Sequence, residues 1–502
     1  MIATSRSRIL GALALALLGA PTLAAEPAVA ADTQRYSPEV LRADLREMYQ
    51  RLAAAHYDLY ARRSKAEYDA QLEKTLRSLD RPLTRFEAEV AFQKFAAFGR
   101  IAHARVDFPS AEFAAFREQG GKILPLRIRV IAERAGEQTD NAVYVTENLS
   151  GLASIELGDR LLQLDGAPIA TWLEKLDANI SGDNAYLVHT QLENRFATLL
   201  WLEAGERPSF RLQLQRNTGR PFAVTVPARS RAEMAAAEER LPKKAELDWD
   251  AREAKMLPGG VAYLRPGPFY ESSPGAPNPW DPAAFHAFID KSFADFQAGD
   301  AKSLLIDLRQ NPGGDDSFSN RMIAFFADRP FRFASDFQIR VSAETTASNR
   351  RRIALGDGDP ASVSSRLAAA YAAKKNGELV HFEIPETPPR AGERFKGKVY
   401  LLIDRHSYSN TASVAALCQD YGFATILGEE TADLATTFGA MEQFELSRTG
   451  ITVGYPKALI LRPNGKQEPR GVVPDIAIPS PVVPPTGDPM LDKAIEIARG
   501  GR

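Results

Sequence analysis

The sequence contains a single cysteine among 502 residues, Cys418. One cysteine excludes an intramolecular disulfide, and it excludes metal sites built from several cysteines. A chain of this length can bury a large core without such cross-links. Cys418 lies in ASVAALCQDYG, which has an amphipathic helical pattern. We therefore expect a buried structural thiol and not a catalytic one.

A large excess of either charge is also missing, as are long apolar runs beyond the N-terminal region. The 62 basic and 64 acidic residues give a formal charge of −2, which offers no basis for binding nucleic acid or an anionic membrane surface. No later segment has the roughly 20 consecutive apolar residues that a membrane span requires.

The one marked apolar run lies at the N-terminus, where Arg6 and Arg8 precede an apolar stretch at residues 9–18. Small residues with cleavage sites between positions 24 and 30 follow, which completes the three-part pattern of a secretory signal. A membrane anchor is the alternative, but the run is shorter than the ~20 residues of a span. We therefore expect residues 1–30 to be a signal peptide, and the mature protein to be periplasmic or extracellular without a stable membrane span.

In the remaining chain the spacing of apolar residues changes twice. This indicates about three domains, in keeping with a length of ~150 residues per domain. Helical spacing dominates the first part, where Ser37 is a candidate N-cap and Thr84 with Glu87 forms a capping-box pattern. Alternating strands follow, with a helical insert near residues 182–202. Strands and helices then alternate from about Asp248, which predicts an α/β core with mainly parallel strands. The expected divisions are a helical domain at 33–118, a strand-rich domain at 119–230, an α/β domain at 248–485 and a tail at 486–502.

Three patches of the last domain carry the candidate chemistry. DLRQNPGG, residues 307–314, ends a buried strand in two glycines, whose backbone can turn sharply and point N–H groups into a cleft. Ser409 lies between a strand and a helix in RHSYSNTASVAAL, where a serine can be an N-cap or can project its hydroxyl from the top of a sheet. QEPRGVVPDIAI, residues 467–478, is by itself a loop and a short strand.

Taken together and in this order, the three patches resemble the catalytic domain of the S41 serine peptidases, which include the C-terminal processing proteases and the tricorn core protease. The resemblance implies a ClpP/crotonase-like core of ββα units, peptide or protein substrates, and an acyl-enzyme mechanism without metal or cofactor. LGDRLLQLDGAPI in the strand-rich domain resembles the end of a PDZ domain. A PDZ-like domain here would bind peptide ends as an added strand.

The resemblance also assigns roles to residues of this chain. Ser409, and not Ser407 or Ser413, is expected as the nucleophile. The N–H groups of Asn410 and of Gly313 or Gly314 are expected to form the oxyanion hole. The lysine that many members use as base is replaced by Leu434, and no lysine occurs between Lys398 and Lys457.

A second branch of the family uses histidine and glutamate, which correspond here to His103 in FGRIAHARVDF and Glu468 in KQEPRGVVPD. The usual Asp-Gly before the histidine is replaced by Ile101 and Ala102. We therefore expect His103 to be the general base and Glu468 to orient its imidazole. His406 is the nearest rival for the base, but a spacing of three residues along a strand end turns its side chain away from Ser409.

Two other functions remain open at this point. A non-catalytic S41-like protein could bind a peptide or an apolar ligand, and the missing lysine is consistent with this alternative. A hydrolase acting on a small ester or amide would use the same groups. A hydrogen-bonding distance between Ser409 and His103 would favour catalysis.

Overall fold

A computed structural model describes residues 34–500, except 136–137, 218, 242–246, 274, 277, 355–359, 361 and 484, and it leaves the side chains of 133–140 undescribed. The predicted signal peptide, residues 1–30, lies outside the described residues. The chain divides into two compact units, which we describe separately. Within the described ranges, no helix is sufficiently long and apolar to cross a membrane.

The first unit comprises Asp107–Asn179 and Gln191–Leu241 and is built on an antiparallel sheet in the order β4-β5-β6-β8-β9, with β7 paired to β6. Asp165 and Gly166 both have positive φ and form the tight turn between β6 and β7, as a two-residue Asp-Gly hairpin requires. The strands are β4 Leu126–Ala135, β5 Gln138–Asn148, β6 Arg160–Leu164, β7 Ala167–Pro168, β8 Ser209–Gln215 and β9 Phe222–Pro227. The helices are α4 Ser110–Glu118, α5 Ile169–Asp177, α6 Ala185–Ala204, which belongs to this unit from Gln191 onward, and α7 Arg231–Glu238.

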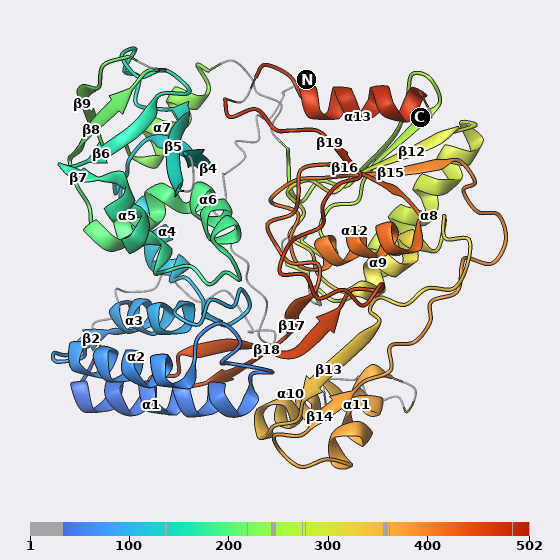
Figure 1. Cartoon of the computed structure of the whole chain (residues 1–502), viewed down its shortest axis with the longest axis horizontal. Helices are drawn as coiled ribbons and strands as arrows, with labels where there is room; N and C mark the ends of the chain where they lie inside the picture. The colour runs from blue at the N-terminus through green and yellow to red at the C-terminus, as the bar shows by residue number, and fades with distance from the viewer. Residues whose placement is uncertain are drawn as a thin grey trace. The chain divides into compact units, whose positions relative to one another are not determined.

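The second unit begins with the predicted helical region. The Ser37 hydroxyl accepts the Val40 N–H, and Thr84 and Glu87 form the reciprocal capping box, so both predicted helix starts are confirmed. The apolar faces of these helices share a core with β18, and Figure 1 shows the three helices lying beside that strand. The elements are β1 Arg35–Tyr36, α1 Pro38–Ala55, α2 Lys65–Ser78, β2 Leu83–Thr84, α3 Arg85–Ala97 and β3 Arg105–Val106.

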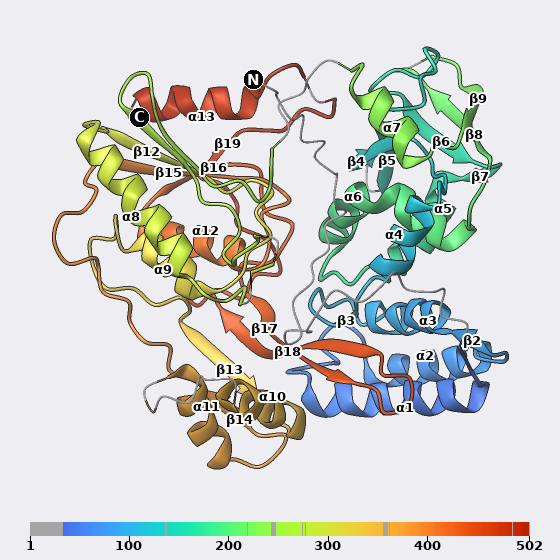
Figure 2. The same ribbon diagram turned by 180° about the vertical axis from the view of Figure 1, so that it is seen from behind.

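A six-stranded sheet in the order β10-β11-β12-β15-β16-β19 forms the centre of this unit, and its strands run parallel from β11 onward. Figures 1 and 2 show helices α8, α9 and α12 on one face and α13 on the other. The strands are β10 Glu253–Leu257, β11 Val261–Arg265, β12 Ser303–Asp307, β15 Lys398–Ile403, β16 Thr425–Gly428 and β19 Ile476–Ala477. The helices are α8 Ala283–Ala298, α9 Asp316–Ile323, α12 Asn410–Tyr421 and α13 Pro489–Gly500.

Helices on both faces explain why the central strands read as continuous apolar runs: every residue of β11 and of β12 is buried. Because β12 and β15 are adjacent and parallel, their carboxyl ends meet at one edge of the sheet. The loop after Asp307 and the loop after Ile403 therefore start side by side.

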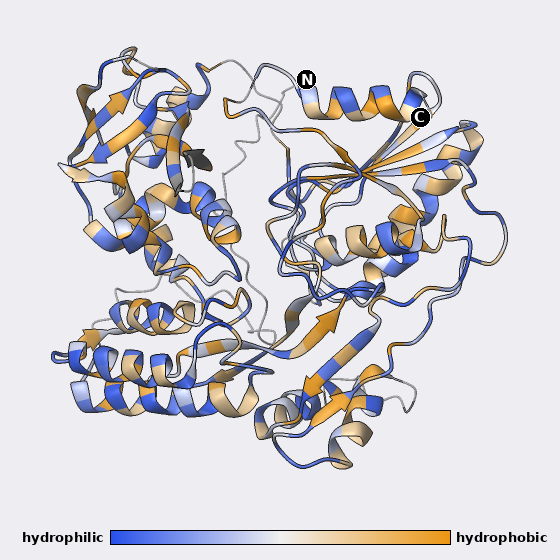
Figure 3. Ribbon diagram, viewed as in Figure 1, coloured by the Kyte–Doolittle hydropathy of each residue, from blue (hydrophilic) through white to orange (hydrophobic). Residues whose placement is uncertain are grey.

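The expected tail at 486–502 contains a helix instead. Helix α13 alternates between hydrophilic and hydrophobic residues along its length (Figure 3) and buries Met490, Ala494 and Ala498. These residues recur at i, i+4 and i+8, so they form one stripe, and this stripe covers the face of the sheet opposite α12. A stripe of three small or flexible side chains after a proline-rich stretch is a weak sequence signal.

A second sheet of this unit has the order β14-β13-β18-β17, and β3 also pairs with β18 through Val106 and Val453. This pairing anchors the end of the 99–106 segment, which carries His103, to the unit that contains Ser409. The strands are β13 Asp336–Arg340, β14 Leu379–His381, β17 Thr437–Glu445 and β18 Thr452–Leu461, and the accompanying helices are α10 Ala343–Ala354 and α11 Val363–Ala372.

Candidate active site

Ser409 occupies a strained turn immediately before α12. Its backbone has φ 56° and ψ −125°, and its side chain makes no capping hydrogen bond. An N-cap serine has extended backbone and caps the helix through its hydroxyl, so the N-cap interpretation is excluded. A non-glycine residue in this region costs about 1–3 kcal/mol and persists only when its surroundings hold it.

The contacts that hold the turn come from two loops. The Ser409 N–H donates to the Asp433 carboxylate at 2.6 Å, and the Tyr408 N–H donates to the Asn311 carbonyl at 3.0 Å. The Ser409 carbonyl accepts the Ser413 N–H at 3.2 Å, which begins α12. None of the hydrogen bonds of the described residues uses the Ser409 hydroxyl, which leaves its oxygen available for a substrate.

The other two serines of the motif have structural positions. Ser407 is fully buried, donates its hydroxyl to the Leu308 carbonyl at 2.9 Å and accepts the Asp404 N–H at 3.1 Å. Ser413 is also buried, within the first turn of α12. Of the three, Ser409 alone combines partial exposure with a side chain that stabilises nothing.

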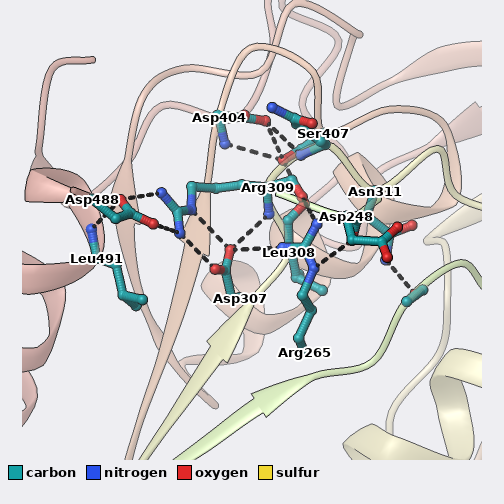
Figure 4. A network of polar contacts seen from close by, with 12 residues as sticks. Asp248, Arg265, Asp307, Leu308, Arg309, Asn311, Asp404, Ser407, Asp488 and Leu491 are labelled. Carbon is teal, nitrogen blue, oxygen red and sulfur yellow. Dashed lines mark hydrogen bonds and ion pairs between the residues drawn. The ribbon is translucent and has the colours of Figure 1, made fainter. Parts of the chain in front are cut away.

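A buried ionic network fixes the DLRQNPGG loop beside Ser409 (Figure 4). Arg309 donates to Asp307 at 2.7 Å and to Asp488 at 2.7 Å, and Arg265 donates to the Arg309 carbonyl at 3.1 Å. Burial alone would raise the pKa of Asp307, but the two guanidinium groups outweigh it and lower that pKa. The Asp404 carboxylate accepts the Gln310 N–H at 3.0 Å and so ties this loop to the Ser409 loop.

Gly313 and Gly314 have φ of 90° and 138°, which L side chains rarely adopt. A Cβ on Gly313 would lie 2.6 Å from the Tyr408 carbonyl, 2.7 Å from the Asn410 nitrogen and 2.9 Å from the Ser409 Cβ. Glycine is thus required for the loop to pass this close to Ser409. The Gly313 N–H donates to the Asn311 side chain at 2.9 Å, whereas the N–H groups of Gly314 and Asn410 have no partner among the hydrogen bonds that the structure describes.

His103 is buried next to the residue that precedes Ser409. Its ring stacks on Tyr408 with centroids 5.5 Å apart, and its Nε2 lies 3.5 Å from the Tyr408 hydroxyl. Burial and the nearby Arg105 lower the pKa of His103 to about 4, so the imidazole is neutral at physiological pH. Its buried Nδ1 forms none of the hydrogen bonds that the structure describes, although the Phe438 backbone is near enough to the imidazole to oppose the lowering of its pKa. The structure therefore brings His103 into the neighbourhood of Ser409, but without a hydrogen bond between them.

Glu468 lies elsewhere in the same unit. Its side chain is 60% exposed and its carboxylate is 3.9 Å from the Lys466 ammonium. Its expected hydrogen bond to His103 is not formed in this conformation. Leu434, at the position of the missing lysine, is buried, and Lys457 is engaged with Glu442 at 2.6 Å. Among the described side chains, no group of three or more His, Cys, Asp or Glu residues is arranged to hold a metal ion.

Residues 269–478, which include the Ser409 turn and the 307–314 loop, match the model of peptidase family S41. The chain carries an S41 peptidase domain. The match supports a serine-type peptidase, and the matched span contains Gly313, Gly314, Ser409 and Glu468, whereas His103 lies before it.

Solved structures extend the structural similarity to nearly the whole chain. Mature CPAF is similar with a TM-score of 0.58 and 17% sequence identity, over 92% of this chain and 94% of CPAF. Mature CPAF complexed with lactacystin is similar with a TM-score of 0.57 and 16% identity, over 92% of this chain and 96% of that chain. Identity at this level shows a shared fold, and the predicted α/β, ClpP-like core is confirmed.

Two buried carboxyl groups near Ser409 and His103 were missed in the sequence. Asp433, next to Leu434, binds the Ser409 N–H. Asp183, in the Ile180–Thr190 segment of the same unit, accepts the Ala102 N–H at 3.3 Å. Burial and the charge of Asp183 raise the pKa of Asp433 to about 7, and burial raises the pKa of Asp183 to about 6. Asp433 could have been noticed because it directly precedes Leu434, the position of the family lysine, but no local pattern marks Asp183.

Proposed function

We propose that the chain is an exported serine peptidase that cleaves peptide bonds through an acyl-enzyme on Ser409. The observation that carries the proposal is the strained Ser409 turn, whose hydroxyl is unused and whose neighbours are two glycines with positive φ. Strain of this kind is concentrated at functional sites. Asn410 and Gly314 are the better pair of oxyanion donors, because the Gly313 N–H is already bound by Asn311.

In the proposed reaction, His103 accepts the Ser409 proton at Nε2 while Oγ attacks the peptide carbonyl carbon. The carbonyl oxygen becomes an oxyanion, which the Asn410 and Gly314 N–H groups stabilise. Collapse breaks the C–N bond, and the amine leaves with the proton from His103. Water then attacks the ester, gives a proton to His103, and the proton returns to Ser409 as the acid departs. For the first step Nε2 has to exchange the Tyr408 hydroxyl for that of Ser409, its neighbour in sequence.

Glu468 remains our proposed orienting group for His103. The unpartnered, buried Nδ1 of His103 supports the need for an acceptor there, because a base with an oriented, carboxylate-bound Nδ1 is stronger. The exposed side chain of Glu468 is held only by Lys466 at 3.9 Å, so a substrate that moves this loop could bring the carboxylate to the ring.

The N-terminal charge and apolar pattern supports export through a signal peptide, and the LGDRLLQLDGAPI stretch supports peptide binding by the antiparallel unit. On this reading the substrates are peptides or proteins outside the cytoplasm. The alternative, a non-catalytic S41-like protein that binds a peptide or apolar ligand, is favoured by one observation: His103 bonds to Tyr408 and not to Ser409.

A fluorophosphonate probe tests both readings on the purified mature protein. Wild type should be labelled, Ser409→Ala and His103→Ala should not, and Ser413→Ala, a neighbouring serine on α12, should label as wild type. Lactacystin, with which mature CPAF was crystallised, is a second probe that should block labelling. A folded wild type that resists both probes would overturn the catalytic proposal and leave the binding protein.

A further inference from the structure

Behind the proposed nucleophile lie two carboxyl groups that the reaction does not use directly. Asp433 is 1% exposed and Asp183 is 7% exposed. They come from distant parts of the sequence but belong to the same unit. Buried carboxylates are ordinarily paired with cations or fully hydrogen-bonded, so this pair needs an explanation.

Each carboxyl group holds the backbone of one half of the proposed site. Asp433 accepts the Ser409 N–H at 2.6 Å and the Leu434 N–H at 2.9 Å. Asp183 accepts the N–H of Ala102, the residue before His103, at 3.3 Å. The pair thus touches both the turn that strains Ser409 and the segment that carries His103.

Apolar packing keeps these segments together. Ala102, Leu187 and Ala432 form a small buried cluster against which Tyr408 packs. The Asn184 amide donates to the Ala432 carbonyl at 3.3 Å, which ties the Asp183 segment to the Asp433 turn.

The positive charge near Asp183 and Asp433 is too small to stabilise both side chains as carboxylates. Among the described side chains, Asp183 forms one ion pair, with the Arg62 guanidinium at 3.9 Å. The other charged or titratable groups on the surrounding segments are Arg100, His103, Arg105, Tyr186, His189, Arg405, His406, Tyr408, Glu429 and Glu430. Arg405 is paired with Glu429 at 3.4 Å, Glu430 with Arg470 at 2.6 Å, and the Arg105 guanidinium lies 3.5 Å from the Met441 sulfur. The second Asp183 oxygen is buried without a hydrogen-bond partner in the described chain. Two buried carboxyls on segments that are tied together in this way, with one partial counter-charge, favour a state in which one proton is retained.

We propose that Asp433 and Asp183 act as a proton-sharing pair of positioning residues. The pair holds the Ser409 turn and the His103 segment in the relative position that the proposed acyl transfer requires. The inference rests on the proposed function for its kinetic part only. While one proton is shared, one carboxyl is neutral and the two attract; once both ionise they repel, and the two backbone segments lose their common anchor.

The first experiment tests the pair itself and is independent of catalysis. Infrared spectroscopy of folded wild type at neutral pH should show the carbonyl stretch of a protonated carboxylic acid, and this band should lose intensity in Asp183→Asn and in Asp433→Asn. Burial also raises the pKa of Asp316 to about 7, so the part of the band that Asp316→Asn removes is assigned to that residue. Asp44→Asn is the matched control, because Asp44 is equally buried and accepts the Thr449 N–H at 2.8 Å far from Ser409. A wild-type spectrum without the band, or a band unchanged in both variants, overturns the pair.

The second experiment tests positioning by fluorophosphonate labelling rates across pH 5–9. Asp433→Asn turns an amide N–H₂ toward a backbone N–H, so its labelling rate should fall by about 10-fold or more, as expected when a reacting group is misplaced by a fraction of an ångström. Asp183→Asn mimics the protonated acid: it should label like wild type at pH 6 and keep its rate above pH 7, where wild type declines. Asp433→Asn at the wild-type rate, or identical pH profiles for Asp183→Asn and wild type, would overturn the positioning role. An unlabelled wild type with the infrared band intact would instead refute the proposed function and, with it, the positioning role, while the proton-sharing pair stands.

Discussion

Replacing Gly313 with alanine should disable the site while leaving the fold intact. The new Cβ would lie 2.6–2.9 Å from three atoms of the 408–410 turn, distances that force the turn to move. A residue with a Cβ at positive φ costs about 1–2 kcal/mol, and overpacking adds about 1–3 kcal/mol. We therefore expect a loss of about 2–5 kcal/mol in the free energy of unfolding. Displacing an oxyanion donor lowers the rate by about 10²–10³-fold, so labelling by the fluorophosphonate should slow by at least that factor.

Gly392→Ala supplies a matched control for the backbone cost. Gly392 has the same φ of 90°, but an added Cβ would meet nothing within 4 Å. This variant should lose only the ~1–2 kcal/mol of the backbone term and should label at the wild-type rate. Urea unfolding and labelling kinetics measure the two effects separately. If folded Gly313→Ala labels as fast as Gly392→Ala, the oxyanion role of this loop is refuted.

Four further outcomes follow from the site and its supports. Because the pKa of His103 is lowered to about 4, the neutral imidazole should support labelling from neutral pH down to about pH 5, and labelling should decline below that. The free energy of unfolding should be fully present above pH 6.5 and should fall by about 3 kcal/mol as the pH falls from 6.5 to 4. His103→Gln should remove this loss, as measured by urea unfolding at several pH values. Arg309→Ala removes the closest cation from buried Asp307, which keeps only the Arg265 guanidinium at 3.5 Å, and should cost about 3–5 kcal/mol by urea unfolding, whereas a change near zero would contradict the network. Glu468→Gln should slow labelling by about 10-fold if it orients His103, and an unchanged rate would remove it from the site. Cys418 is fully buried and burial raises its thiol pKa, so thiol reagents should react with the unfolded protein only.

The supports of the site were predictable where they depend on sequence periodicity and strand order. The alternation of strands and helices predicted the parallel sheet, and adjacency of parallel strands brings the 307–314 loop to Ser409. The strain at Ser409 was not predictable, since the same local sequence suits an N-cap. Its φ of 56° results from Asp433 and Asn311 holding the turn from two sides, which are tertiary contacts.

The position of Asp183 beside the site could not be predicted from sequence patterns. Asp183 lies in a helical insert between two stretches of the antiparallel unit, and its neighbours in sequence indicate only a helix start. It reaches the site because the Ile180–Thr190 segment groups with the other unit. Glu468 was selected by position beside the GVVPD patch, and this conformation leaves its carboxylate beside Lys466 in solvent.

The distribution of the Ser409 unit along the chain has a consequence for biosynthesis. Its described residues come from 34–106, from Ile180–Thr190 and from 247–500. His103 leaves the ribosome 305 residues ahead of Tyr408, against which it stacks. Asp488, which completes the Arg309 network, and α13, which covers the back of the sheet, are translated later still. The turn that carries Ser409 therefore lacks part of its support in a nascent chain until Asp488 and α13 have been translated.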